Sequence, residues 1–113
     1  MTSLADKKCL PCEGNPTPLS QEQKSELLKE VNGWQLREDG KELKKCIKTN
    51  SFIKGVELIK ALTPIAEEEG HHPDIELTYP TLTIRISTHS AGDITEADFV
   101  LAAKIDRLEN STD

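Results

Sequence analysis

The pattern of apolar and polar positions in the first third of the chain predicts a short helix followed by a hairpin. Ser20, with Gln23 three residues later, forms a capping-box pattern, and apolar residues then recur at helical spacing, which predicts a helix over residues 20–31. The stretches WQLRE and KELKKCIKT are strand-like, and Asp39-Gly40 between them is typical of a turn. We therefore expect two antiparallel strands after the first helix.

The next apolar pattern predicts the longest helix of the chain, from an N-cap at Ser51 to about Glu69. Its apolar residues recur at three- and four-residue steps: Phe52, Val56, Ile59, Leu62, Ile65 and Ala66. Pro64 lies inside this pattern and removes one backbone hydrogen bond, so a kink is expected there. Gly70 suits the position just beyond a helix end, where a left-handed backbone is common.

The last third of the chain predicts a second hairpin and a third helix. DIELTYP and TLTIRISTH are strand-like, and alternation along the second stretch separates an apolar face from a polar face. The apolar face holds Leu82, Ile84 and Ile86, and the polar face holds Thr83, Arg85, Ser87 and His89. Thr95 with Asp98 is an N-cap pattern that begins a final helix, which we expect to fray at NSTD.

The resulting element order, αββαββα, indicates the fold class. Hairpins imply antiparallel pairing, so the sequence predicts an α+β fold with a four-stranded antiparallel sheet and three helices packed on one face. Residues 1–18 are expected to form a flexible N-terminal arm, because CEGNPTPLS has two prolines and a glycine and shows no periodicity. The folded domain is expected over residues 19–110.

Composition and charge narrow the class of protein. The chain has 113 residues, enough for one domain, and a net charge of −6. That charge would repel a nucleic-acid backbone, so nucleic acid is expected to be reached only through a protein partner. The apolar runs are far shorter than a membrane span, and MTSLADKKCLPCEG lacks the apolar core of a signal peptide. We expect a cytoplasmic protein with no membrane association.

The three cysteines give little sign of a metal or redox site. Cys9 and Cys12 form a C-x-x-C, but a structural zinc site normally needs a second such pair, and Cys46 stands alone. We interpret the pair as reduced thiols on the arm. The lysines around Cys46 are expected to form a solvated strand face: Lys44, Lys45 and Lys48.

All three histidines fall within nineteen residues, in EEEGHHPDIELTYP and RISTHSAGD. His71 and His72 directly follow the predicted end of the long helix, where the helix dipole favours a protonated imidazole. His89 falls at the end of a predicted strand. Pairing of the strands would bring these two places together, so the three histidines are expected to line one pocket.

Three interpretations of the histidine cluster are open. In the first, the rings donate and accept protons in general acid–base catalysis, and an acidic residue orients them. The candidates for that acidic residue are Glu67, Glu68, Glu69 and Asp98. In the second, the cluster holds a metal ion, although adjacent residues on an extended backbone point to opposite sides, which disfavours one ion bound by both His71 and His72. In the third, the histidines are polar junction residues without chemistry.

The run EEEGHHPDIEL…TIRISTHSAGDITEADFVLAAKID resembles the pterin-4a-carbinolamine dehydratase family. The family pattern is an acidic residue, then His-His-Pro, an aromatic residue, Thr-His at a strand end and an aspartate in the last helix. Its counterparts here are Glu67, His71, His72, Pro73, Tyr79, Thr88, His89 and Asp98. The resemblance extends upstream through GWQL to about Leu19, and it implies the same element order.

The resemblance implies a reaction, the dehydration of 4a-hydroxytetrahydropterin to quinonoid dihydropterin in tetrahydrobiopterin recycling. The catalytic residues would be His71 and His89 as the acid–base pair and His72, which would mainly bind and position the pterin. The polar edge of the pterin ring would be met by Gly70, Pro73, Ser87, Thr88 and Ser90, together with the histidines. Asp98 would orient a histidine or support the start of the last helix, and Glu67 would have a supporting role. No metal or organic cofactor would be required, because the pterin is the substrate.

The resemblance also implies partners and alternatives. A homodimer or homotetramer is expected, with an aromatic amino-acid hydroxylase as pathway partner. Some family members serve as dimerisation cofactors of a homeodomain transcription factor, a binding role that would use an exposed helical face. A role in pterin or molybdopterin metabolism on another substrate is a third alternative. The intact set of histidines favours the enzyme.

Two positions depart from the family pattern. Ile75 stands where many members have tryptophan, and Pro80 stands where the hairpin usually has glycine or asparagine. Because proline cannot adopt the positive φ of a tight primed turn, this hairpin must turn differently. Trp34 is expected in the core or an interface rather than at the ligand.

Overall fold

The computed structural model describes residues 19–88 and 92–111, and within them the predicted order αββαββα is confirmed. The helices are α1 (Gln21–Leu28), α2 (Phe52–Glu69) and α3 (Glu96–Ser111). The strands are β1 (Gln35–Leu36), β2 (Leu43–Lys48), β3 (Asp74–Thr78) and β4 (Thr81–Ile86). The predicted N-terminal arm lies outside the described residues.

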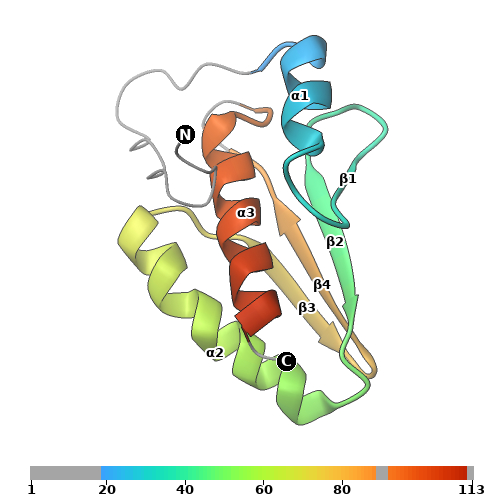
Figure 1. Cartoon of the computed structure of the whole chain (residues 1–113), viewed down its shortest axis with the longest axis vertical. Helices are drawn as coiled ribbons and strands as arrows, with labels where there is room; N and C mark the ends of the chain where they lie inside the picture. The colour runs from blue at the N-terminus through green and yellow to red at the C-terminus, as the bar shows by residue number, and fades with distance from the viewer. Residues whose placement is uncertain (1–18, 89–91, 112–113) are drawn as a thin grey trace.

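The four strands form one antiparallel sheet in the order β1-β2-β4-β3, so the two hairpins meet at the central β2–β4 pair. The helices α2 and α3 lie side by side on one face of this sheet, and α1 lies beside the start of α3 (Figure 1). A hydrogen bond of 3.1 Å from the Leu19 N–H to the Ile94 carbonyl ties the start of α1 to the segment before α3. The predicted α+β class is therefore confirmed.

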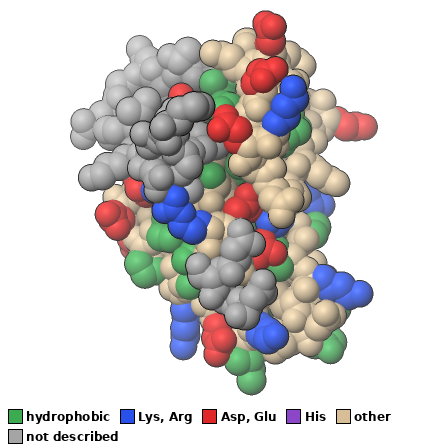
Figure 2. Space-filling model, viewed as in Figure 1, with side chains coloured by type: hydrophobic (Ala, Val, Ile, Leu, Met, Phe, Trp, Pro, Cys, Tyr) green, Lys and Arg blue, Asp and Glu red, His purple; other side chains and the backbone are tan. Residues whose placement is uncertain are grey.

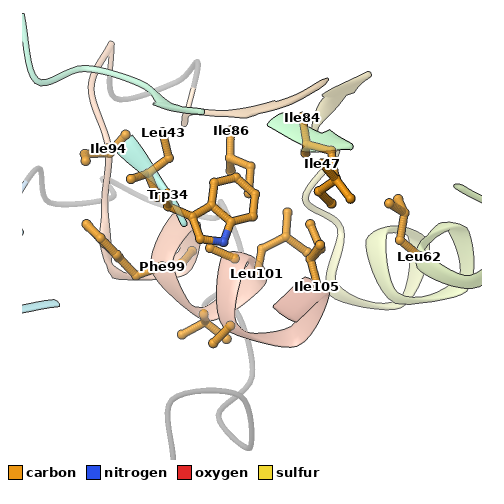
Figure 3. Packing of buried hydrophobic residues seen from close by; sticks show 14 of the residues in the cluster. Trp34, Leu43, Ile47, Leu62, Ile84, Ile86, Ile94, Phe99, Leu101 and Ile105 are labelled. Carbon is orange, nitrogen blue, oxygen red and sulfur yellow. The ribbon is translucent and has the colours of Figure 1, made fainter. Parts of the chain in front are cut away.

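One apolar cluster fills the space between the sheet and the helices (Figure 3). The predicted inner face of β4 is buried, and Trp34 is buried with it, as expected for a core residue. The helix α3 contributes fully buried side chains at Phe99, Leu101 and Ile105. Each large apolar side chain buried in this way stabilises the fold by roughly 1.5–3 kcal/mol, which fixes α3 against the sheet.

The helix α2 begins and ends as predicted, but it buries a different set of residues. Its N-cap is Ser51, and the helix continues through Pro64 to Glu69. The buried positions are Gly55, Leu58, Leu62 and Ala66, whereas Phe52 is exposed. The glycine explains the difference, because a β-carbon on Gly55 would lie 2.6 Å from the Cδ1 of Leu77. The helix therefore packs tightly against Leu77 of β3 at Gly55.

Lys45 corrects the expectation of a solvated lysine face on β2. Residues two apart on a strand share a face, so Lys45 lies with the core residues Leu43 and Ile47 on the helical side. It is only 6% exposed. Its Nζ donates to Asp106 Oδ1 at 2.8 Å and to Glu109 Oε1 at 2.6 Å, both on α3. The prediction was wrong because it grouped Lys45 with Lys44 and Lys48, which lie on the opposite face of the strand.

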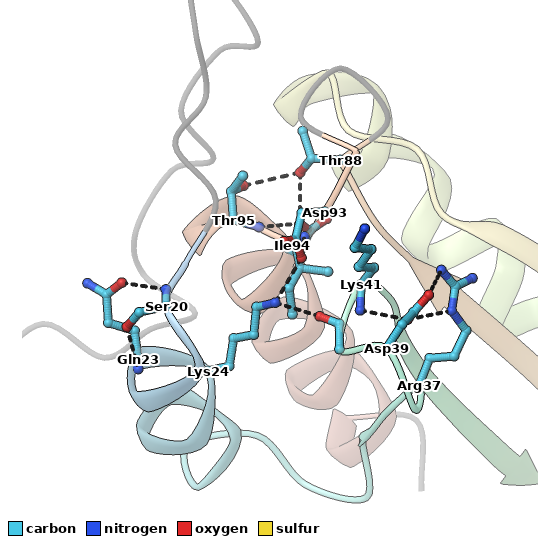
Figure 4. A network of polar contacts seen from close by, with 12 residues as sticks. Ser20, Gln23, Lys24, Arg37, Asp39, Lys41, Thr88, Asp93, Ile94 and Thr95 are labelled. Atoms are coloured by element: carbon cyan, nitrogen blue, oxygen red, sulfur yellow. Dashed lines mark hydrogen bonds and ion pairs between the residues drawn. The ribbon is translucent and has the colours of Figure 1, made fainter.

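A second buried lysine, Lys24 of α1, holds three segments together (Figure 4). Its Nζ donates to the Gly40 carbonyl at 2.7 Å and to Asp93 Oδ1 at 2.8 Å. The first contact reaches the turn between β1 and β2, and the second reaches the segment before α3. The hydrogen bond from Lys24 is the main reason that the pKa of the Asp93 carboxyl lies below its usual value.

Acidic and basic side chains are interspersed on the face of the molecule shown in Figure 2. Among the described residues, no helix combines the length and the apolar character needed to cross a bilayer.

Asp93→Asn is expected to lower the free energy of unfolding by about 1–2 kcal/mol at neutral pH, because a hydrogen bond between charged groups becomes one to a neutral amide. The pKa of Asp93 is lower in the folded protein, so the carboxylate stabilises the fold above the unfolded value of about 3.9 and loses that effect as the pH falls through the folded pKa. Urea denaturation between pH 7 and pH 2 measures the difference from the wild type.

The matched control is Glu26→Gln, which removes a carboxylate from the exposed Glu26–Lys29 pair and is expected to have little effect at any pH. A gap between wild type and Asp93→Asn that stays constant down to the lowest pH would contradict the role of the Asp93 charge.

Candidate active site

The end of α2 fixes the backbone of His71. Gly70 adopts a left-handed conformation with φ of 64°, and its N–H points back to the carbonyls of Ala66 and Glu67. The His71 N–H donates to the Ala66 carbonyl at 3.1 Å. These bonds satisfy the free carbonyls of the last helical turn, as in a Schellman motif. The chain therefore leaves the helix in one direction, and His71 has a defined starting point.

The His71 side chain points into the protein and pairs with Asp98 in the first turn of α3. His71 is 5% exposed and Asp98 is 0% exposed. The distance from His71 Nε2 to Asp98 Oδ1 is 2.5 Å. Of the four acidic residues that the sequence offered as a partner for the rings, Asp98 is the partner of His71.

Asp98 also receives two hydrogen bonds on its other oxygen. The Thr88 hydroxyl and the Thr95 N–H each donate to Asp98 Oδ2 at 2.7 Å. The bond from the Thr95 N–H to the Asp98 side chain is one of the two bonds of the predicted capping pattern. The Thr95 hydroxyl, which would form the other, lies 3.1 Å from the Thr88 hydroxyl. The start of a helix also favours a negative charge.

These contacts determine which nitrogen of His71 faces Asp98 as a donor. A carboxylate only accepts hydrogen bonds, so the hydrogen between the two groups belongs to His71 Nε2. The other ring nitrogen, Nδ1, is the one that this contact leaves for another partner. In many acid–base sites, a carboxylate orients an imidazole through one ring nitrogen, and the other ring nitrogen transfers the proton.

His72 lies in very different surroundings from His71. Its Nε2 is 2.5 Å from Glu67 Oε2, and the two side chains are 62% and 68% exposed. Adjacent residues on an extended segment point to opposite sides, so one histidine enters the protein and the other faces solvent. An exposed polar contact of this kind stabilises a fold little. Solvent exposure leaves the His72 ring open to a ligand.

The other expected site residues that the structure describes differ in burial. Gly70 is exposed, Pro73 and Ser87 are half-buried, and Thr88 is buried with its hydroxyl directed to Asp98. His89 and Ser90 lie outside the described residues, and so does the expectation that all three histidines line one pocket. Within residues 19–88 and 92–111, no three His, Cys, Asp or Glu side chains converge in an arrangement that could hold a metal ion.

The two departures from the family pattern lie at the surface of the β3–β4 hairpin. Ile75 is partly exposed, on the opposite side of β3 from Asp74 and Glu76. The hairpin contains a cis peptide bond between Tyr79 and Pro80.

Gly70→Ala is expected to lower the free energy of unfolding by about 1–2 kcal/mol, because a β-carbon disfavours the left-handed backbone. Steric clash does not contribute, since a β-carbon on Gly70 would meet no atom within 4 Å. Asparagine tolerates this conformation better, so Gly70→Asn should lose less. Chemical denaturation compares the two variants, and equal losses would contradict the conformational explanation.

Comparison with known proteins supports a shared origin. Residues 17–108 match the protein family described as pterin 4 alpha carbinolamine dehydratase. A Rickettsia bellii relative, named for the same dehydratase, is 42% identical over 109 residues, which cover 96% of each chain. The mitochondrial pterin-4-alpha-carbinolamine dehydratase 2 of Arabidopsis thaliana is 41% identical and is matched over 60% of its length and 96% of this chain.

A solved structure shows the same fold. The crystal structure of a transcriptional coactivator/pterin dehydratase from Brucella melitensis superposes with a TM-score of 0.77 at 24% identity, over 81% of this chain and 98% of that one. With the family match over residues 17–108 and relatives about 40% identical over nearly the whole chain, the protein belongs to the pterin 4 alpha carbinolamine dehydratase family, a family of hydro-lyases.

Proposed function

We propose that this protein dehydrates 4a-hydroxytetrahydropterin to quinonoid dihydropterin by general acid–base catalysis in tetrahydrobiopterin recycling. The observation that carries the proposal is the buried contact of 2.5 Å between His71 Nε2 and Asp98 Oδ1, in a chain that belongs to a dehydratase family. A buried imidazole oriented by a buried carboxylate is suited to proton transfer.

The reaction needs two proton transfers and no change of oxidation state. The bond between carbon 4a and the hydroxyl breaks, and a proton delivered to that oxygen lets it leave as water. The N5–H gives its proton to a base, and its electron pair forms the new double bond between N5 and carbon 4a. Since only protons and water move, the proposal needs no redox cofactor.

His71 is the proton-transfer group that the structure supports best. Asp98 holds its Nε2, so Nδ1 is left to exchange a proton with the pterin. In a site with little solvent, the negative carboxylate also stabilises the imidazolium that forms when Nδ1 takes up a proton. Fixing the ring in advance removes the entropy cost of orienting it during the reaction.

The other residues have supporting roles in this proposal. The family resemblance assigns His89 as the second member of the acid–base pair. His72, exposed beside Glu67, binds and positions the pterin. The polar edge of the ring meets groups at Gly70, Pro73, Ser87 and Ser90. Thr88 holds Asp98 through its hydroxyl and meets the pterin through its backbone carbonyl, because its N–H donates to the Asp93 carbonyl.

The proposed function also implies a pathway partner, a cellular compartment and an oligomeric state. The 4a-hydroxypterin is produced by an aromatic amino-acid hydroxylase, which makes that enzyme the pathway partner in the cytoplasm. The protein acts as a homodimer or homotetramer, as the family resemblance implies.

His71→Asn is expected to lower kcat for dehydration by about 10²–10⁴-fold, the usual contribution of a general acid or base. His89→Ala should have an effect of the same order. His72→Asn should act mainly on KM, because its role is binding. The assay follows the decay of 4a-hydroxytetrahydropterin, generated by a hydroxylase, with and without the protein.

The two possible failures have different meanings. If the folded wild type does not accelerate the decay beyond the uncatalysed rate, the dehydratase function is wrong for this chain. If the wild type is active and folded His71→Asn retains full kcat, the function stands but the role of His71 is wrong. Circular dichroism of each variant confirms that it is folded.

A further inference from the structure

A continuous series of contacts connects a lysine on α1 to the His71–Asp98 pair. It begins at Lys24, which is 5% exposed and donates to Asp93 Oδ1 at 2.8 Å. Its Nζ also donates to the Gly40 carbonyl at 2.7 Å. Figure 4 shows the lysine side chain directed toward Asp93. Lysine is rarely buried to this degree unless its charge is paired, so its place here is defined by these two acceptors.

Asp93 connects Lys24 to Thr88, which follows the end of β4. Its Oδ1 also accepts the Ile94 N–H at 2.7 Å, so the side chain folds back on its own segment. Its backbone carbonyl accepts the Thr88 N–H at 3.0 Å, within an isolated antiparallel bridge between the two residues. The position of Asp93 therefore sets the position of the Thr88 backbone.

Thr88 completes the connection to the site. Its hydroxyl donates to Asp98 Oδ2 at 2.7 Å, and Asp98 Oδ1 is the partner of His71. Thr88 is also followed in the sequence by His89, the second proposed acid–base residue. A displacement of Asp93 would thus change the orientation of the Asp98 carboxylate through two hydrogen bonds, one from the Thr88 N–H to Asp93 and one from the Thr88 hydroxyl to Asp98.

We propose that Lys24 and Asp93 are positioning residues for the His71–Asp98 pair. They act through Thr88: the lysine holds Asp93, Asp93 holds the Thr88 backbone, and the Thr88 hydroxyl sets the orientation of the carboxylate that orients His71. The proposal rests on the proposed catalytic role of His71. It places part of the catalytic machinery on α1, which contributes no residue that touches the pair itself.

The chain offers a matched control for this inference in Lys45. Like Lys24, it is a buried lysine with two acceptors, and it also contacts α3. Its partners, Asp106 and Glu109, lie two to three helical turns beyond Asp98 on α3. Lys24→Met and Lys45→Met therefore remove the same kind of interaction and differ in what that interaction holds.

The test measures the ring resonances of His71 and the steady-state kinetics in Lys24→Met, Asp93→Asn and Lys45→Met. Loss of a signal in His71→Asn identifies the His71 resonances in ¹⁵N-labelled protein. We expect Lys24→Met and Asp93→Asn to shift or broaden the His71 Nε2–H signal and to lower kcat by about tenfold, with KM changed much less, since misplacement of a catalytic group by a fraction of an ångström acts on kcat. Lys45→Met should leave both unchanged.

Each other outcome overturns the inference. If Lys24→Met and Lys45→Met alter the His71 signal and kcat equally, the effect is one of general stability. If Lys24→Met and Asp93→Asn are folded and leave the signal and kcat unchanged, Lys24 and Asp93 do not position the His71–Asp98 pair. Should Lys24→Met fail to fold, Asp93→Asn decides alone, because asparagine keeps the size and an acceptor oxygen and removes only the charge.

The spectroscopic measurement separates this inference from the proposed function. The His71 resonances are recorded on the free protein and need no pterin. If the wild type has no dehydratase activity but Asp93→Asn changes the His71 signal, the proposed function is wrong and the positioning role of Asp93 stands. If the wild type is active but Asp93→Asn changes neither the His71 signal nor kcat, the proposed function stands and the positioning role is wrong.

Discussion

The buried carboxylate of Asp98 is the constraint on which the site depends. Taking a charged carboxylate out of water costs several kcal/mol unless donors replace the lost water, and Asp98 has no exposed surface. Its donors come from three places: Thr88 after β4, Thr95 before α3 and His71 after α2. The charge is therefore satisfied only when all three chain segments meet. The same requirement that stabilises the fold also places an imidazole in a defined orientation.

The helix α3 connects this site to the rest of the protein. Its apolar side is buried against β2 and β4, and charged contacts fix it along its length: Asp98 near its start, and Asp106 and Glu109 toward its end. Asp106 also accepts the Trp34 Nε1–H at 2.8 Å. Throughout the described residues, no buried side-chain nitrogen or oxygen lacks a hydrogen-bond partner. Fully satisfied polar groups of this kind specify one packing of the helix rather than several.

The sequence predicted local features well and long-range pairs poorly. The helix caps at Ser20 and Ser51 and the capping pair of Thr95 with Asp98 follow from residues three apart, so they were readable from the sequence. Lys45 was misjudged because its partner Asp106 is 61 residues away and no local pattern indicates it. The contact of Lys24 with Asp93, 69 residues away, left no sequence signal for the same reason.

The difference between His71 and His72 shows how a small backbone feature places two adjacent side chains in different surroundings. The left-handed Gly70 ends α2, and the extended segment after it points the two adjacent rings in opposite directions. The ring that enters the protein meets a carboxylate in a site of low polarity, where a charge on the imidazole and the charge of Asp98 interact strongly. The ring that stays in solvent meets Glu67, where water screens the same kind of pair. The buried histidine is therefore the one we propose for proton transfer, and the exposed histidine is the one we propose for binding.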